Sequence, residues 1–255
     1  MYPKLFTGKV AIVTGAGQGI GFEICRQLCL QGAAVLLNDI DETLTTEAIT
    51  KIKLEAGNCI GLPGDAGDVV FIQQMLDKAV SEFGKLDIVI ANAGITLFAD
   101  FFEYTPEAFY KVMHLNLGGS FFLAQAAAKQ MKEQKTRGSI LFMSSVVGHQ
   151  AHKNLAAYAI TKAGLEMLAK NLVIELSPYD ITVNAIAPGA TLTERTLDDK
   201  DYEKTWSRIT PIGRPATTLD IANAALFMVS PNAKNITGQS LVIDGGWTSI
   251  SPSPY

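Results

Sequence analysis

The sequence predicts a doubly wound α/β fold, in which helices cover both faces of one parallel sheet. Short apolar runs recur along the chain and lack the strict alternation expected of a sheet with one face in water. Each run leads into a segment with apolar residues at helical spacing. The first run also enters its helix through a glycine-rich turn. Strands connected through helices in this way are typical of a parallel sheet buried on both faces.

The first half of the chain repeats this strand–helix unit. β-Branched and apolar runs predict its strands, and one of them stops at Asn38 and Asp39. The third helix has the clearest apolar face, formed by Phe71, Ile72, Met75, Leu76, Ala79 and Val80. In chain order we predict strand 9–13, helix 19–31, strand 34–37, helix 42–56, strand 59–62, helix 69–83 and strand 86–90.

The second half predicts two long helices and a shorter one, again separated by apolar runs. No segment rich in Pro or Ser and no shift in composition interrupts the pattern, so we expect a single domain over residues 1–255. The predicted elements are helix 107–134, strand 139–143, helix 156–176, strand 181–186, helix 219–229 and strand 240–243.

Composition excludes several classes of protein. Hydrophobic residues make up 48% of the 255 residues and charged residues 18%, which is enough to form a core and excludes a disordered chain. The formal net charge of −4, without a basic stripe, argues against nucleic-acid binding. No run approaches the ~20 apolar residues of a membrane span, so no membrane partner is expected.

The three cysteines, Cys25, Cys29 and Cys59, are too few for a disulfide-stapled secreted domain. Cys25 and Cys29 lie one helical turn apart, but no histidine or third cysteine is near them in sequence. We therefore expect core or surface thiols and no metal site. The first four residues lead into a strand rather than an apolar signal segment, which favours a cytoplasmic location.

The glycine-rich turn spans residues 14–21 (Thr-Gly-Ala-Gly-Gln-Gly-Ile-Gly) between the first strand and the first helix. Backbone amides and the positive end of the helix dipole can hold a pyrophosphate there, and glycines let the phosphate approach the main chain. The spacing of Gly15, Gly19 and Gly21 differs from the commoner dinucleotide fingerprint, so a purely structural turn is the alternative.

Asp39 follows the second strand, about twenty residues after the turn. A carboxylate at this point can accept hydrogen bonds from the adenosine ribose hydroxyls and repels a 2′-phosphate. Gln18, Asn38 and Ile40 supply no cation that would neutralise such a phosphate, so the predicted cofactor is NAD rather than NADP. The alternative for Asp39 is a helix cap.

Tyr158 and Lys162 are four residues apart at the start of a predicted helix and therefore share one face. A phenol with the ordinary pKa of ~10 is a poor base at neutral pH. A cation at ~4 Å can stabilise the phenolate by up to ~4 kcal/mol at an effective dielectric of ~20. Such a tyrosine can take a proton from an alcohol or return one to a ketone. Alone, the pair is also compatible with an ordinary helix surface.

Together the motifs resemble the short-chain dehydrogenase/reductase family, and they follow the family's order over essentially the whole chain. They are the turn at 14–21, Asn92-Ala93-Gly94, Asn116, Ser144-Ser145, Tyr158 with Lys162, and Pro188-Gly189. The resemblance implies a seven-stranded Rossmann sheet with one cofactor site at the carboxyl ends of the strands. It also implies hydride transfer between nicotinamide and a carbinol carbon.

The catalytic residues follow from the same resemblance. Tyr158 resembles the family's acid/base, and Lys162 the residue that activates it and holds the nicotinamide ribose. Ser145 resembles the hydroxyl that polarises the substrate carbonyl; Ser144 is the alternative, but the thirteen-residue spacing to Tyr158 favours Ser145. Asn116 resembles the residue that positions a water in the proton relay, and it can also bend its helix by bonding to nearby backbone.

The resemblance further implies the cofactor contacts. Asn92 and Gly94 flank the adenosine ribose, Asp65 lies near the adenine amino group, and Ala66 is smaller than the residue typical of that position. The residues after the sixth strand orient the carboxamide. The predicted NAD-binding residues are Gly15, Gln18, Gly19, Ile20, Gly21, Asp39, Asp65, Ala66, Asn92, Gly94, Tyr158, Lys162, Pro188, Gly189, Thr191 and Thr193.

Substrate choice is expected in two segments. The loop between Ser145 and Tyr158 edges the substrate cleft in this family, and we hypothesise that its polar side chains favour a sugar or polyol; solvated loop residues are the alternative. These side chains are His149, Gln150, His152 and Asn154. The segment 190–211 matches the family's variable lid.

The leading prediction is an NAD-dependent dehydrogenase of a secondary alcohol or sugar, similar to glucose dehydrogenases and working in the oxidative direction because free NAD⁺ exceeds NADH. Apolar residues on several faces of the long helices, including Phe121, Phe122, Leu172 and Val173, indicate a subunit contact, and the resemblance implies a homotetramer. One alternative is an NADPH-dependent 3-oxoacyl-carrier-protein reductase. Another is a catalytically silent dinucleotide-binding regulator.

Overall fold

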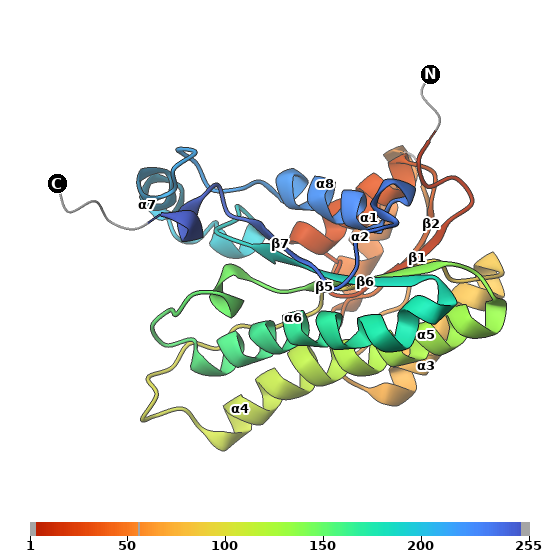
Figure 1. Cartoon of the computed structure of the whole chain (residues 1–255). Helices are drawn as coiled ribbons and strands as arrows, with labels where there is room; N and C mark the ends of the chain where they lie inside the picture. The colour runs from red at the N-terminus through yellow and green to blue at the C-terminus, as the bar shows by residue number, and fades with distance from the viewer. Residues whose placement is uncertain (1–3, 56, 251–255) are drawn as a thin grey trace.

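The computed structural model describes residues 4–55 and 57–250. Within them, seven parallel strands form one sheet in the order β3-β2-β1-β4-β5-β6-β7 (Figure 1). The doubly wound α/β fold predicted from the sequence is therefore confirmed. The strands are β1 (Val10–Val13), β2 (Ala34–Leu37), β3 (Asn58–Gly61), β4 (Ile88–Ala91), β5 (Gly138–Met143), β6 (Ile181–Pro188) and β7 (Ser240–Ile243).

Helices connect these strands and cover both faces of the sheet. All predicted helices have a counterpart, and the end of the helix predicted over 42–56 falls on Ala56, which lies outside the described residues. The helices are α1 (Gly19–Leu30), α2 (Glu42–Glu55), α3 (Val69–Phe83), α4 (Pro106–Val112), α5 (Ser120–Gln134), α6 (Ala156–Leu176), α7 (Tyr202–Ile209) and α8 (Thr218–Val229).

Two apolar cores lie on opposite sides of the sheet. Helices α1, α2 and α8 pack on one face, and α3, α5 and α6 pack on the other (Figure 1). Neighbouring residues of one strand alternate between the cores: Ala11 and Val13 contribute to the first, and Ile12 contributes to the second. All three residues are fully buried, which explains why the central strands are apolar on both faces.

The long helix predicted over 107–134 is interrupted. The segment Met113–Gly119 is a π-helix between α4 and α5. The side chain of Asn116, in its middle, is fully buried and bonds to the backbone of Ile95 rather than to its own helix. π-Helices are rare and occur mostly as single wide turns inside α-helices, and the apolar periodicity of the sequence does not reveal them.

The segment predicted as a lid over 190–211 contains one turn of 3₁₀-helix, Glu194–Thr196, and the amphipathic helix α7. Aromatic rings join this helix to the end of the described chain. Tyr202 lies 6.0 Å from Trp206 between ring centroids, and Trp206 lies 5.1 Å from Trp247.

Candidate active site

The main cavity lies at the carboxyl ends of the strands and reaches the switch point between β1 and β4, where doubly wound sheets bind ligands. Its volume is about 810 Å³. The predicted site residues that line it are Gly15, Gln18, Gly19, Ile20, Gly21, Asp39, Asn92, Gly94, Ser145, Tyr158, Lys162, Pro188, Gly189, Thr191 and Thr193. The strand order thus brings together side chains that are more than 150 residues apart in sequence.

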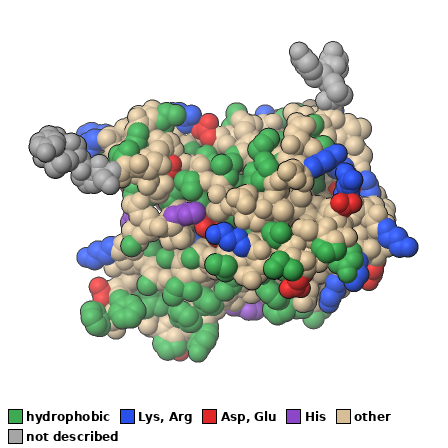
Figure 2. Space-filling view, viewed as in Figure 1, with side chains coloured by type: hydrophobic (Ala, Val, Ile, Leu, Met, Phe, Trp, Pro, Cys, Tyr) green, Lys and Arg blue, Asp and Glu red, His purple; other side chains and the backbone are tan. Residues whose placement is uncertain are grey.

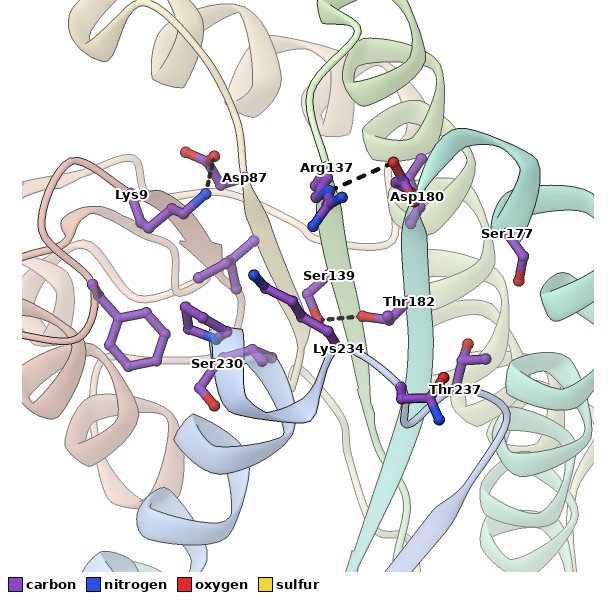
Figure 3. Close-up of a pocket in the computed structure, with 17 residues that line it drawn as sticks. Lys9, Asp87, Arg137, Ser139, Ser177, Asp180, Thr182, Ser230, Lys234 and Thr237 are labelled. Carbon is purple, nitrogen blue, oxygen red and sulfur yellow. Dashed lines mark hydrogen bonds and ion pairs between the residues drawn. The ribbon is translucent and has the colours of Figure 1, made fainter.

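A second hollow of about 570 Å³ lies at the opposite, amino ends of the strands (Figure 3). Several of its polar groups pair with one another: Lys9 with Asp87 at 2.9 Å, and Arg137 with Asp180 at 3.5 Å. The hydroxyls of Ser139 and Thr182 are likewise 3.0 Å apart. The motif residues Gly19, Tyr158 and Lys162 line the cavity at the carboxyl ends and not this hollow, so the candidate site is that cavity.

The turn after β1 has the shape of an anion cradle. Gly15 and Gly19 have φ values of +61° and +63°, in the left-handed region that favours glycine. A Cβ on Gly21 would lie 2.5 Å from the carbonyl oxygen of Gly15, so only glycine fits there. Helix α1 begins at Gly19, and its N-cap residue Gln18 makes no side-chain capping bond within the described residues. The first amides of α1 are therefore left for a ligand.

Asn92, at the end of β4, holds this turn in place. Its Nδ2 donates to the carbonyl oxygens of Thr14 at 2.9 Å and Gly15 at 2.8 Å. In return, the Thr14 hydroxyl accepts bonds from the amides of Asn92 and Ala93 at 3.2 and 3.1 Å. These bonds join β1 and β4 across the switch point, so Asn92 supports the cradle as well as lining the cavity.

Asp39 lies beside the same turn. Its Oδ2 accepts a hydrogen bond from the amide of Gly17 at 2.9 Å, and its Oδ1 accepts one from the amide of Asp41 at 3.2 Å. The half-buried carboxylate therefore lies against the cradle. Ile40, the next residue, is 74% exposed and brings no positive charge.

Asp65 and Ala66 follow β3 and do not line the main cavity. Asp65 Oδ1 accepts a bond from the amide of Gly67 at 2.7 Å, and Ala66 is buried. The amide of Gly64 donates to the Asp39 carbonyl at 2.9 Å, so this segment adjoins Asp39 at the outer end of the site.

Tyr158 and Lys162 lie on the first two turns of α6. The Lys162 ammonium is 5.3 Å from the centroid of the Tyr158 ring and donates to the carbonyl oxygen of Met143 at 2.6 Å. The lysine is 3% exposed. A buried ammonium needs such partners, and they hold its charge beside the tyrosine. The arrangement suits a phenol that exchanges a proton with a bound alcohol or ketone.

Ser145 and Ser144 have different surroundings. Both residues line the cavity, but among the described residues the hydroxyl of Ser145 accepts one long bond, 3.5 Å, from the amide of Val147. The hydroxyl of Ser144 donates to Glu166 at 2.6 Å and is 2% exposed. Ser145 is therefore the hydroxyl that remains for a substrate oxygen.

Asn116 occupies the π-helix behind the cavity. Its Oδ1 accepts from the amide of Ile95, and its Nδ2 donates to the Ile95 carbonyl, both at 2.9 Å. The Nδ2 also lies 3.3 Å from the Thr161 hydroxyl on α6. The side chain thus fixes the loop after β4 against the helix that carries Tyr158.

The segment after β6 closes the cavity on its remaining side. The Thr191 hydroxyl donates to the Gly189 carbonyl at 3.0 Å, and its amide donates to the hydroxyl of Tyr202 at 3.2 Å. Burial raises the pKa of the Tyr202 phenol. A Cβ on Gly19 would lie 3.6 Å from Glu194 Oε2 and 3.7 Å from Thr193, so this segment lies against the glycine turn.

The predicted role of His149 at the substrate cleft is not what the structure shows. Its Nε2 lies 2.9 Å from Glu166 Oε1, and the residue is not among those lining the main cavity. Asn154 adopts φ +64°, and its carbonyl accepts a bond from Ala99, so it supports the loop before α4. Sequence reasoning missed Glu166, although it lies four residues after Lys162 and so on the face that Tyr158 and Lys162 share.

The three cysteines are buried in the core beside α1 and β3. Burial raises the pKa of the Cys25 thiol, and a hydrogen bond with Cys59 together with burial raises that of Cys29. Over residues 4–55 and 57–250, no three His, Cys, Asp or Glu side chains are grouped as a metal site would require. Nor is any described helix long and apolar enough to cross a membrane.

Comparisons with known proteins found similar sequences over nearly the whole chain. A family model described as Enoyl-(Acyl carrier protein) reductase matches residues 15–248. L-rhamnose 1-dehydrogenase (NAD(P)(+)) of Azotobacter vinelandii is 35% identical over 250 residues, covering 95% of this chain and 97% of the relative. Diacetyl reductase, (S)-acetoin forming, of Staphylococcus epidermidis is 33% identical over 251 residues, covering 93% and 98%.

Solved structures are similar over nearly the whole chain. A short-chain type dehydrogenase/reductase from Mycobacterium marinum has a TM-score of 0.91 at 30% identity and covers 96% of this chain and 98% of its own. A 3-ketoacyl-(acyl-carrier-protein) reductase from Brucella melitensis complexed with NADH has a TM-score of 0.89 at 31% identity and covers 95% and 99%.

Proposed function

The chain belongs to the short-chain dehydrogenase/reductase family, and from this premise we propose that it transfers a hydride between NAD(H) and a secondary alcohol or ketone. It is an oxidoreductase acting on CH–OH groups. The observation that carries the proposal is the juxtaposition of Tyr158, Lys162 and Ser145 at one end of a cavity whose other end is the glycine cradle. The cradle fits a dinucleotide, because its glycines and the uncapped start of α1 leave room and donors for a pyrophosphate.

Each residue has a defined part in this mechanism. When bound, the nicotinamide supplies the hydride acceptor or donor. Tyr158 takes the hydroxyl proton of an alcohol onto its phenol oxygen, or returns one to a ketone. The buried ammonium of Lys162 stabilises the phenolate that forms, and Ser145 donates a hydrogen bond to the substrate oxygen. Asn116 holds the loop and helix on either side of these groups in register.

NAD rather than NADP is our proposal for the cofactor. The Asp39 carboxylate faces the cradle, where it can accept bonds from ribose hydroxyls and repel a 2′-phosphate. Asp65 and Ala66 are proposed to border the adenine, and Pro188, Gly189, Thr191 and Thr193 the nicotinamide. The relative from Azotobacter is named for both cofactors, so titration with NAD⁺ and NADP⁺ is the direct test. Tighter binding of NADP⁺ would contradict the proposal.

For the substrate we propose a sugar or another small polyol, in the oxidative direction. Support comes from the rhamnose dehydrogenase among the relatives, while the diacetyl reductase points to small ketones and the Brucella structure to ketoacyl thioesters. Absorbance of NADH at saturating substrate separates these classes: L-rhamnose and other sugars, acetoin with diacetyl, and a 3-hydroxybutyryl thioester. Turnover of the thioester alone, with NADPH preferred, would instead favour a 3-oxoacyl-carrier-protein reductase. No turnover by any member of a broad panel would favour the silent regulator.

We also propose a cytoplasmic homotetramer, in which the segment 190–211 is a lid. Hydrophobic side chains gather over α4 and the loop before it (Figure 2). Exposed apolar residues of this region and of the neighbouring helices include Phe101, Phe102, Tyr110, Phe121, Phe122, Ile160 and Met167. A patch of this extent supports burial against a second copy. A monomeric mass by light scattering would contradict the proposal, and Phe122→Glu should dissociate a tetramer.

A further inference from the structure

The carboxylate of Glu166 is nearly enclosed behind the reacting groups. Glu166 lies one turn after Lys162 on α6, and its side chain is only 12% exposed. Its Oε1 accepts a hydrogen bond from Ser144 Oγ at 2.6 Å and lies 2.9 Å from His149 Nε2. Burying a carboxylate is costly unless donors satisfy it, so these two contacts are what keep it in place.

Two bonds fasten the end of β5 to α6. Lys162 Nζ donates to the carbonyl oxygen of Met143 at 2.6 Å. The next residue, Ser144, donates its hydroxyl to Glu166, and the same hydroxyl lies 3.0 Å from the Lys162 carbonyl. Ser145 follows directly, so its backbone position is set by the two residues before it.

The chain beyond Ser145 is fastened to the same carboxylate. A Cβ on Gly148 would lie 2.8 Å from Glu166 Oε1 and 3.1 Å from Ser144 Oγ, so the short helix Val146–Gly148 passes directly against it. The next residue, His149, contacts Glu166 and lies 3.4 Å from the Ser240 hydroxyl on β7. Glu166 therefore holds the backbone both before and after Ser145.

We propose that Glu166 is a positioning residue for the reaction, which acts through Ser144 and His149 to aim the Ser145 hydroxyl at the substrate oxygen beside Tyr158. The proposal rests on the proposed function of Ser145 and Tyr158. In this proposal His149 helps to hold the segment that carries Ser145 and does not contact the substrate. Misplacement of a catalytic group by about 1 Å can cost on the order of 10²-fold in rate.

The test compares Glu166→Ala with Glu166→Gln, and uses Glu175→Ala, an exposed glutamate on the same helix, as the control. For each variant, kcat and KM are measured with the best substrate of the panel above, and the Kd of NAD⁺ by titration. Hydrogen exchange over residues 143–150 is measured without substrate. In Glu166→Ala we expect kcat to fall at least ~10-fold, the Kd for NAD⁺ to stay within about twofold, and exchange to accelerate.

Glu166→Gln should keep most of kcat, because its amide oxygen can still accept from Ser144 and His149. Ser144→Ala removes the hydroxyl that donates to Glu166 and leaves the carboxylate in place. In the double variant with Glu166→Ala, the loss of kcat should be smaller than the sum of the two single losses, because both substitutions break the same contact.

Three results would overturn the proposal: wild-type kcat in Glu166→Ala, equal losses in the alanine and glutamine variants, or unchanged exchange over 143–150. Failure of the proposed function is distinguishable, because the wild-type protein would then turn over no substrate of the panel. Even if the wild-type protein turns over no substrate, the hydrogen-exchange measurement still shows whether Glu166 holds residues 143–150 in place.

Discussion

Lys162 holds its ammonium 5.3 Å from the centroid of the Tyr158 ring while donating to the carbonyl oxygen of Met143. The lysine is thus fixed by β5 at the point where it can stabilise a phenolate on α6. Because the phenol oxygen is the proposed proton acceptor, Tyr158→Phe should lower kcat by at least ~10²-fold. The Kd for NAD⁺, measured by fluorescence titration, should change by less than about tenfold.

The matched control is Tyr179→Phe, which removes the same hydroxyl from an exposed residue outside the cavity and outside the proposed subunit contact. It should leave kcat unchanged. If Tyr158→Phe kept the wild-type kcat, another group would have to accept the proton, and the mechanism proposed for Tyr158 would be wrong.

Asp39 should determine which dinucleotide binds. Its carboxylate faces the amide of Gly17 and lies where a 2′-phosphate would be repelled. Asp39→Ala should weaken NAD⁺ and tighten NADP⁺, so that the ratio of the two Kd values shifts by at least ~10-fold, as expected for the loss of a charge-assisted bond. The comparison is Glu47→Ala, an exposed carboxylate on α2, whose Kd ratio should equal that of the wild type. An unchanged ratio in Asp39→Ala would show that selection lies elsewhere.

Most of the fold could be predicted from local patterns. The strand Ala34–Leu37 and the helix Ala156–Leu176 have the predicted bounds, because buried strands and long helices leave strong apolar signals. The edge strand Ser240–Ile243 also has the predicted bounds, although it is only partly buried. The π-helix around Asn116 could not be predicted, since its cause is a pair of bonds to Ile95 twenty-one residues away. Helix α7 was predicted only as part of a lid, because it is short and polar.

The candidate site likewise has residues that the sequence predicts and contacts that it does not. Residues carried by sequence motifs, such as Tyr158 and Gly19, line the cavity where the parallel sheet brings strand ends together. The partner of His149 could not be predicted from the loop that carries it. That partner, Glu166, comes from a different element, and only packing brings α6 against the short helix after β5. Supporting contacts of this kind depend on tertiary structure, whereas the motif residues depend on spacing.

Glu194 should weaken cofactor binding. Its carboxylate oxygen lies 3.6 Å from where a Cβ of Gly19 would be, close to the amides that are proposed to hold the pyrophosphate. Like charges repel there, so Glu194→Gln should lower the Kd for NAD⁺ by about two- to fivefold at low salt. Because the group is exposed, the gain should largely vanish at ~1 M salt, where the Debye length is ~3 Å.

Glu203→Gln on α7 removes an exposed carboxylate from the same segment, 190–211, and is the control. Its Kd for NAD⁺ should follow that of the wild type at both salt concentrations. A Glu194→Gln variant that bound NAD⁺ no better at low salt would exclude a repulsive role for this carboxylate.

Asp220, in the first turn of α8, should make the free energy of unfolding depend on pH. Its carboxylate forms two bonds with the Arg214 guanidinium, at 2.6 and 3.2 Å, and it closes a capping box by accepting from the amide and hydroxyl of Thr217. The bond to Arg214 is the largest cause holding the pKa of Asp220 well below its ordinary value. The folded state therefore favours the ionised form more than the unfolded state does. The resulting stability is complete above the unfolded pKa of ~3.9 and is lost as pH falls through the lower folded pKa.

Asp220→Asn keeps a capping oxygen but removes the charge, so it should lower the free energy of unfolding at pH 7 by at most about 1 kcal/mol, since the pair is partly exposed. The difference in Tm from the wild type should be constant between pH 5 and 7 and shrink below pH ~4. Arg214→Gln should show the same dependence because it removes the other member of the pair. Glu133→Gln, at an exposed position of α5, is the control for a general loss of negative charge. If the Tm difference were as large at pH ~2.5 as at pH 7, the introduced amide would be disturbing packing or capping. The ionised pair of Asp220 and Arg214 would then contribute nothing to the free energy of unfolding.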